Sequence, residues 1–434
     1  MKKNHVIYPY MEENKKRILK EVNYAEGVFV FDSEGHKYLD GLGGLMNIIL
    51  GYKNKRINNA ISSQLNKIPF VNLWSNTNEK TEELALRILG KSGNDFSKLM
   101  YSTTGSEAIE LAIKLARKVS YNQNDNKKKY VVGLDISYHG TTYGAMSVTG
   151  IEQYEMNTIS PKLPGIALIA TPDFNKNDHS NYIKYLNAYF EKNHENIAAF
   201  LLEPIMASSG VIKLDSEILS CIQMNCKRYS ILLISDEVTT AYFRTGSFFA
   251  YQSLGIKPDI VCISKAMTNG YLPMAAVLIN DKVSDLLDMN EPIPHFSTQN
   301  GNPVCAAAAI EVLNILDEGP NVNSEIKRSS NKIYQALKNR VDKLPTVYEI
   351  RAEGMMFAVE LRNKNKVLSF NEVWAYVELM KKNGLLVYPF ATYKTSGIAL
   401  LPPYIINDEE VLLLEDIIYN TLVEINIKSE SITL

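Results

Sequence analysis

Seven short apolar segments alternate with helix-like stretches between residues 97 and 319, and this alternation limits the fold more than any other feature. The segments read KLMYS, KYVVGLD, IALIA, IAAFLLEP, SILLISDE, DIVCIS and MAAVLIN. Ile, Leu and Val stand at successive positions in them, which is typical of parallel strands covered by helices on both faces. The sequence therefore predicts an α/β fold with a large, mostly parallel sheet.

The two ends of the chain have a different pattern of apolar and polar residues. EGVFVFDSEGHKYLDG alternates apolar and polar residues, and Gly35 marks a hairpin turn. The C-terminal part holds amphipathic helix patterns around a second hairpin-like stretch, YEIRAEGMMFAVEL. We expect a large domain at 51–319 and a smaller α+β domain built from 1–50 and 320–434.

Composition excludes several classes of protein. The 434 residues include 46 Lys and Arg against 48 Asp and Glu, a net charge of −2. This balance argues against a nucleic-acid partner or a polybasic membrane binder. No apolar run approaches the roughly 18 residues of a membrane span, and the first residues lack a secretory signal, so we expect a cytoplasmic protein. The four cysteines form no CxxC pair and are expected to be buried free thiols, with no metal site.

One segment has the features of an anion site. In YSTTGSEAIELAIKLARK, an apolar run leads into Thr104-Gly105-Ser106-Glu107, which fits a capping box at a helix start. Free N–H groups and the positive end of the helix dipole meet at such a start, and both suit a phosphate. On this segment alone, a plain helix cap is an equally good interpretation.

Two further segments place charged side chains at the ends of expected strands. SILLISDEV ends in Asp236 and Glu237, at the strand end where ligands bind in open α/β sheets, so we expect Asp236 to meet a cation. Either acid could instead cap the next helix. DIVCISKAM ends in Lys265, which would lie beside Asp236 if the strands are neighbours. Partial burial would lower the pKa of this lysine and make it nucleophilic, whereas most lysines face solvent.

A phosphate cradle, a strand-end acid and a strand-end lysine together are what pyridoxal phosphate requires. The stretch DEVTTAYFRTGSFFAYQSLGIKPDIVCISKAMTNGYLPM resembles the signature of class III pyridoxal-phosphate aminotransferases. GSEAIELAIKLAR resembles the phosphate segment of that family, SYHGTTYGAMS its ring-stacking segment and HFSTQNGNPVCAAAA its intersubunit phosphate segment. Within the family, HVIYPYM, YHGTTYGAMSV and LLPPYII are most similar to diaminopelargonate (adenosylmethionine-8-amino-7-oxononanoate) aminotransferases. The likeness spans nearly the whole chain.

The resemblance implies a fold-type I homodimer with active sites at the subunit interface and pyridoxal 5'-phosphate as cofactor. Lys265 would hold the cofactor as a Schiff base and move the proton, and Asp236 would pair with the ring nitrogen. The other implied cofactor contacts are Gly105 and Ser106 at the phosphate, Thr298 at the phosphate of the neighbouring subunit, Tyr138 with His139 and Val238 at the ring faces, and Glu203 near the ring hydroxyl. Without the resemblance, Tyr138 and Val238 would be read as ordinary core residues.

Departures from the family pattern concern the substrate. Phe296 replaces a glycine in HFST, Met46 replaces an expected aromatic residue, and Tyr388 stands where the nearest relatives carry an arginine. An arginine there would bind a substrate carboxylate through two hydrogen bonds, whereas tyrosine offers one hydroxyl. We expect an acceptor without a carboxylate at that spot, including larger natural-product or peptide precursors. Tyr10 and Trp74 are further candidates for lining the pocket.

The predicted reaction moves an amino group from an amine or amino-acid donor to a ketone or aldehyde acceptor by a ping-pong mechanism. One alternative is 8-amino-7-oxononanoate amination in biotin synthesis. A second is a racemase, decarboxylase or lyase that uses the same cofactor and lysine. A third is a non-enzymatic binding protein that has kept the fold, against which intact Lys265 and Asp236 argue.

Overall fold

The large sheet has seven strands, and each lies within one of the seven apolar segments. The computed structural model describes residues 5–8, 21–123, 125–151, 157–174, 178–287, 291–318 and 322–432. Across the sheet the order is β4 (Lys98–Ser102), β12 (Ala275–Ile279), β11 (Ile260–Ile263), β10 (Leu232–Asp236), β7 (Ile197–Leu202), β5 (Tyr130–Leu134) and β6 (Ile166–Ile169). Strand β12 is antiparallel to both of its neighbours and the other pairings are parallel. The predicted α/β fold with a mostly parallel sheet is confirmed.

Successive side chains of the central strands enter different apolar clusters, because neighbours in a strand point to opposite faces. In β10, Leu232 and Ile234 belong to one cluster and Leu233 to the other. Helices covering the first face are α4 (Gly105–Asn122), α5 (Tyr143–Val148) and α10 (Asp281–Leu286). Helices covering the second are α2 (Lys55–Lys67), α3 (Glu79–Lys91), α7 (Ser180–Asn193), α8 (Ser216–Arg228) and α11 (Pro303–Glu318).

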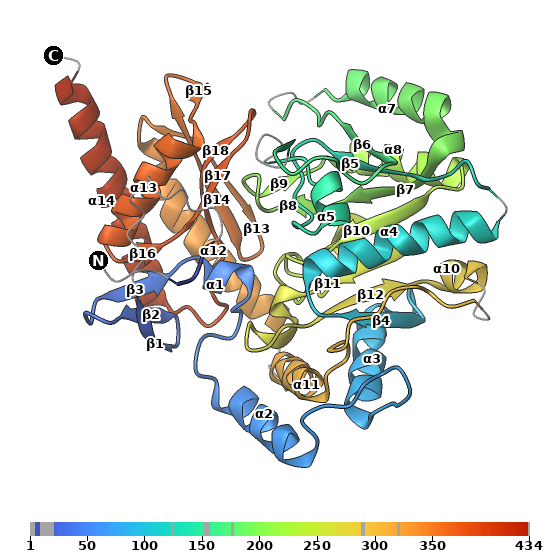
Figure 1. Ribbon diagram of the computed structural model, residues 1–434. Helices are drawn as coiled ribbons and strands as arrows, with labels where there is room; N and C mark the ends of the chain where they lie inside the picture. Colours follow the sequence, from blue (N-terminus) through green and yellow to red (C-terminus); the bar gives the residue numbers. More distant parts are fainter. Residues whose placement is uncertain are drawn as a thin grey trace.

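A separate apolar cluster joins the two ends of the chain. Strand β3 (Lys37–Asp40) pairs in parallel with β16 (Leu385–Leu386), so the N-terminal strands lie beside the C-terminal segment (Figure 1). One sheet contains β1 (Val22–Glu26), β2 (Phe29–Asp32), β3 (Lys37–Asp40) and β16 (Leu385–Leu386). The other contains β13 (Val347–Glu353), β14 (Met356–Asn363), β15 (Lys366–Val367), β17 (Tyr388–Ala391) and β18 (Ser396–Leu400). Helices α12 (Val322–Arg340), α13 (Phe370–Lys382) and α14 (Asp408–Ile432) complete this part.

The expected hairpins are both present. Strands β2 and β3 are antiparallel, and Gly35 between them has φ 86°. Strands β13 and β14 are also antiparallel, with Gly354 at φ 58°. The domain bounds 1–50, 51–319 and 320–434 remain a prediction, which the separate apolar clusters support.

Arg244 connects the large sheet region to the C-terminal strands. It is fully buried, and its Nη1 donates to the carbonyls of Met355 at 3.2 Å and Pro402 at 2.8 Å. A Cβ on Gly354 would lie 2.3 Å from the Arg244 carbonyl oxygen, so only glycine fits there. These contacts join the two parts of the molecule at Arg244 and Gly354.

Two sequence expectations concern cysteines and membranes. All four cysteines are free and buried, as expected. Within the described ranges, no helix combines the length and the apolar character that crossing a bilayer requires.

Candidate active site

A cavity of about 300 Å³ lies at the carboxyl ends of the central strands. It is bounded by the residues that follow β4, β5, β7, β10 and β11, together with Asn47 and Leu272–Met274. Eight of the predicted site residues line it, namely Gly105, Ser106, Tyr138, His139, Glu203, Asp236, Val238 and Lys265. Side chains from distant parts of the sequence therefore meet at one edge of the sheet, as expected for this type of fold.

The two acids at the end of β10 have different partners. Asp236 is buried, and its Oδ2 lies 2.7 Å from His139 Nδ1, while Oδ1 accepts a hydrogen bond from Val238 N at 3.0 Å. Glu237 turns the other way and accepts from Ala250 N and Tyr251 N, each at 2.7 Å. It thus caps the short helix α9 (Ala250–Leu254). The sequence left the capping role open between the two acids, and the structure assigns it to Glu237.

Glu203 is a third buried acid at this edge. It follows β7 and accepts a hydrogen bond from Tyr138 N at 2.8 Å. Burial raises the pKa of Glu203 to about 7, and the nearby charge of Asp236 acts in the same direction. Burial therefore favours the protonated carboxyl of Glu203 more than it is favoured in an exposed glutamate.

Lys265 begins a single 3-10 turn, separated from the end of β11 by Ser264. Its Nζ donates to Thr239 Oγ1 at 2.7 Å and lies 3.6 Å from Met46 Sδ. Burial lowers the pKa of Lys265, and the charges of Asp236 and Glu203 oppose that effect. Strands β10 and β11 are adjacent and parallel, so the lysine and the acid leave neighbouring strands.

The start of α4 forms part of the wall of the cavity. Thr104 caps the helix by accepting Glu107 N at 3.2 Å, and the first-turn N–H groups have no acceptor within the helix. A Cβ on Gly105 would lie 2.9 Å from Val238 Cγ1, so this helix start packs closely on the β10 turn. A Cβ on Gly140, which has φ 112°, would lie 2.1 Å from Ser106 Oγ.

The predicted substrate residues are spread more widely. Met46 is buried in an apolar cluster with Phe390, and Tyr388 packs against that cluster from the first position of β17. Trp74 and Phe296 contact each other edge to face at 5.6 Å but are 79% and 48% exposed. These two rings, and exposed Thr298, do not line the cavity. Tyr10 lies outside the described residues.

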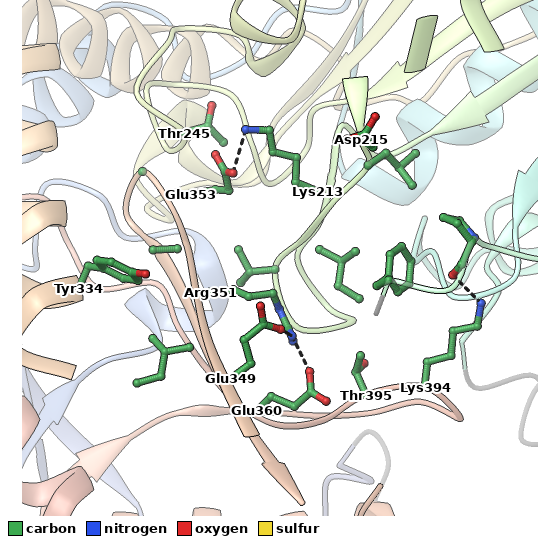
Figure 2. Close-up of a pocket in the computed structure, with 18 of the residues that line it drawn as sticks. Lys213, Asp215, Thr245, Tyr334, Glu349, Arg351, Glu353, Glu360, Lys394 and Thr395 are labelled. Atoms are coloured by element: carbon green, nitrogen blue, oxygen red, sulfur yellow. Dashed lines mark hydrogen bonds and ion pairs between the residues drawn. The ribbon is translucent and has the colours of Figure 1, made fainter. Parts of the chain in front are cut away.

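A second and larger cavity, of about 1220 Å³, lies between the large sheet region and strands β13 and β14 (Figure 2). Several oppositely charged side chains that line it form ion pairs. Lys213 of β9 (Ile212–Lys213) contacts Glu353 at 3.0 Å, and Arg351 contacts both Glu349 and Glu360. Lys265 does not line this cavity. The larger volume of this second cavity therefore does not identify it as the active site.

Residues 10–422 match the family model described as Aminotransferase class-III. The chain belongs to the class III aminotransferases. It is 32% identical to an adenosylmethionine-8-amino-7-oxononanoate aminotransferase of Staphylococcus aureus, an alignment that covers 84% of each chain. It is 31% identical to a putrescine–pyruvate aminotransferase of Pseudomonas aeruginosa, over 83% of this chain and 80% of that one.

Solved structures agree with the family. An amine transaminase from an uncultivated Pseudomonas species, solved with pyridoxal phosphate bound, superposes with a TM-score of 0.90 at 25% identity. The match covers 97% of this chain and 99% of that one. The fold is thus that of a fold-type I enzyme, the cofactor is pyridoxal 5'-phosphate, and the reaction is transfer of an amino group. A racemase, decarboxylase or lyase is not favoured.

The residues around the 300 Å³ cavity fit this cofactor. They supply a helix start for a phosphate, buried Asp236 for a ring nitrogen and the amine of Lys265 for an aldehyde. His139 Nε2 is buried and has no hydrogen-bond partner among the described residues, so a polar group remains to be satisfied beside the cavity.

Sequence reasoning missed two features of this site. The first is the contact of Thr239 with Lys265. The only feature of the sequence that could have indicated it is the position of Thr239, three residues after Asp236. Gly140 allows the loop after β5 to approach Ser106, and its signal was a glycine after Tyr138-His139. Neither signal separates these residues from ordinary turn residues.

Proposed function

We propose that Lys265 carries the cofactor of this aminotransferase and that Asp236 faces the ring nitrogen. The observation that carries the proposal is that both side chains line one cavity with the open start of α4. When bound, pyridoxal phosphate supplies an electron sink that stabilises negative charge on the substrate carbon. The residues of the chain then have to bind the cofactor and the substrate, hold them in the right orientation and move a proton.

Lys265 is suited to move that proton. Burial lowers its pKa, so a larger share of Nζ is a neutral amine that can accept a proton from the substrate carbon and return it. Asp236 would hold the ring nitrogen protonated, and His139, at 2.7 Å from Oδ2, would orient the carboxylate. Glu203 would lie on the ring hydroxyl side, and Tyr138 and Val238 would lie against the two ring faces.

The phosphate would bind at the start of α4, through the backbone of Gly105 and Ser106. We propose that a second copy of the chain contributes Thr298, so that the active protein is a homodimer. Support comes from the exposure of Thr298, Trp74 and Phe296 in a single chain, since the two exposed rings are apolar surface that a partner would cover. The expected cytoplasmic location remains a prediction.

For the substrate, we propose an amino acceptor that places no carboxylate group near Tyr388. Lys265 is the only lysine or arginine among the described residues that line the cavity, and Met46 and Phe390 make the neighbouring cluster apolar. The relatives do not decide the question, because one is named for 8-amino-7-oxononanoate and another for putrescine and pyruvate. Tyr10, Trp74 and Phe296 stay proposed pocket residues.

Two half-reactions test these proposals separately. Donor amine added alone should convert the bound cofactor to its pyridoxamine form, which a racemase would not accumulate. Acceptors are then added to that form, and a simple ketone or aldehyde should restore the original absorbance faster than 8-amino-7-oxononanoate does. Efficient reaction of 8-amino-7-oxononanoate would disprove the substrate proposal and leave the aminotransferase assignment intact.

A further inference from the structure

A hydroxyl group from the turn after the neighbouring strand accepts a hydrogen bond from the amine of Lys265. Lys265 Nζ donates to Thr239 Oγ1 at 2.7 Å, and Met46 Sδ lies 3.6 Å from the same nitrogen. Thr239 follows β10 and Lys265 follows β11, and these strands are adjacent and parallel. The contact therefore joins two strand ends inside the cavity that both residues line.

The turn that carries Thr239 is held on either side of it. Val238 N donates to Asp236 Oδ1 at 3.0 Å, and Ala241 N donates to the Glu237 carbonyl at 3.1 Å. These hydrogen bonds hold the backbone that presents the Thr239 hydroxyl to Lys265, and the β-branched side chain has few χ1 rotamers. A lysine, by contrast, has a flexible four-carbon stem that does not fix its own amine.

We propose that Thr239 is a positioning residue, whose hydroxyl sets the direction in which Lys265 Nζ exchanges a proton with the substrate carbon. This inference rests on the proposed role of Lys265. A neutral amine has two N–H groups and one lone pair, and anchoring one N–H on Thr239 leaves the lone pair for the cavity. Proton transfer is sensitive to such alignment, so its loss reduces the rate without removing the base.

The pKa of Lys265 depends on the charged groups around it and on the hydrogen bond to Thr239. Asp236 from β10 and Glu203 after β7 favour the protonated amine, whereas burial and the charge of Arg244 favour the neutral one. Thr239 accepts an N–H bond, which stabilises the protonated amine more than the neutral one. Removing the hydroxyl therefore moves the titration of Lys265 to lower pH.

The test compares Thr239→Val, which keeps the shape but removes the hydroxyl, with Thr239→Ser, which keeps the hydroxyl. We expect T239V to lower kcat about tenfold, with KM for the donor changed less than about twofold. T239S should restore kcat to within about threefold of the unchanged enzyme. Competitive chemical labelling of Lys265, in enzyme loaded with pyridoxamine phosphate, should titrate at lower pH in T239V but not in T239S.

Either of two results would overturn the proposal. In the first, T239V keeps kcat and the labelling titration unchanged. In the second, T239S behaves like T239V, which would mean that the methyl group matters. If T239V does not fold, Thr239→Ala takes its place against the same serine control. Borohydride fixation of the cofactor on Lys265 in the unchanged enzyme checks the proposed lysine separately, because its failure there would reject the role of Lys265 whatever the Thr239 variants show.

Discussion

The two sides of the site are built differently. On the proposed cofactor side, the acidic and basic groups are mostly buried and paired, as in Asp236 with His139 and Lys265 with Thr239. On the proposed substrate side, Met46 lies in an apolar cluster, and Trp74 is 79% exposed in a single chain. Buried polar groups are costly unless they are paired, so the cofactor side tolerates few substitutions. Apolar contacts depend mainly on volume, so the substrate side can change while the chemistry is retained.

The largest effects should separate the two acids at the end of β10. Asp236→Asn removes a negative charge from the cavity, and we expect kcat to fall about 10³-fold. Glu237→Gln keeps one acceptor for the N-terminus of α9, so kcat should change less than about threefold while the free energy of unfolding falls by about 1–3 kcal/mol. Steady-state kinetics and urea unfolding of both variants measure the contrast. Equal losses of kcat would contradict the division of roles.

A smaller effect concerns the pH dependence of stability. The pKa of Glu203 is about 7 in the folded protein against 4.5 normally, so the folded state binds more protons than the unfolded state between these values. Stability therefore falls as pH rises through that window, by at most about 3 kcal/mol from this group. Glu203→Gln should reduce this slope without abolishing it, because burial also raises the pKa of Glu237 to about 7.

Urea unfolding of the cofactor-free proteins at about pH 5 and about pH 8 measures the slope for the unchanged protein and for Glu203→Gln. Using cofactor-free protein keeps ligand binding out of the comparison. An identical slope in the two proteins would show that Glu203 is not the group that titrates.

The smallest effect tests the substrate side. Tyr388→Arg adds a guanidinium next to the Met46 cluster, and we expect kcat/KM to rise about tenfold for acceptors that carry a carboxylate, since hydrogen bonds to a charged group contribute about 1.5–3 kcal/mol. Tyr388→Phe is the control and should show no such gain. Each acceptor is compared with its uncharged amide. A gain of equal size for the amides would mean that Tyr388 does not lie at the predicted position.

The sheet could be predicted because its signal is local and repeated. Each of the seven apolar runs became a strand, and the turn at Gly35 followed from residue type. The capping role could not be assigned to Asp236 or Glu237, because adjacent residues in a strand point to opposite sides and only the position of α9 distinguishes those sides. The Thr239 contact depends on turn geometry that no periodicity encodes.

The most direct test of the central claim is to reduce the holoenzyme with borohydride, digest it and locate the cofactor by mass spectrometry. The account predicts a single tagged peptide that contains Lys265, and no tag in Lys265→Ala. A tag on another lysine, or active enzyme without any tag at Lys265, would contradict it.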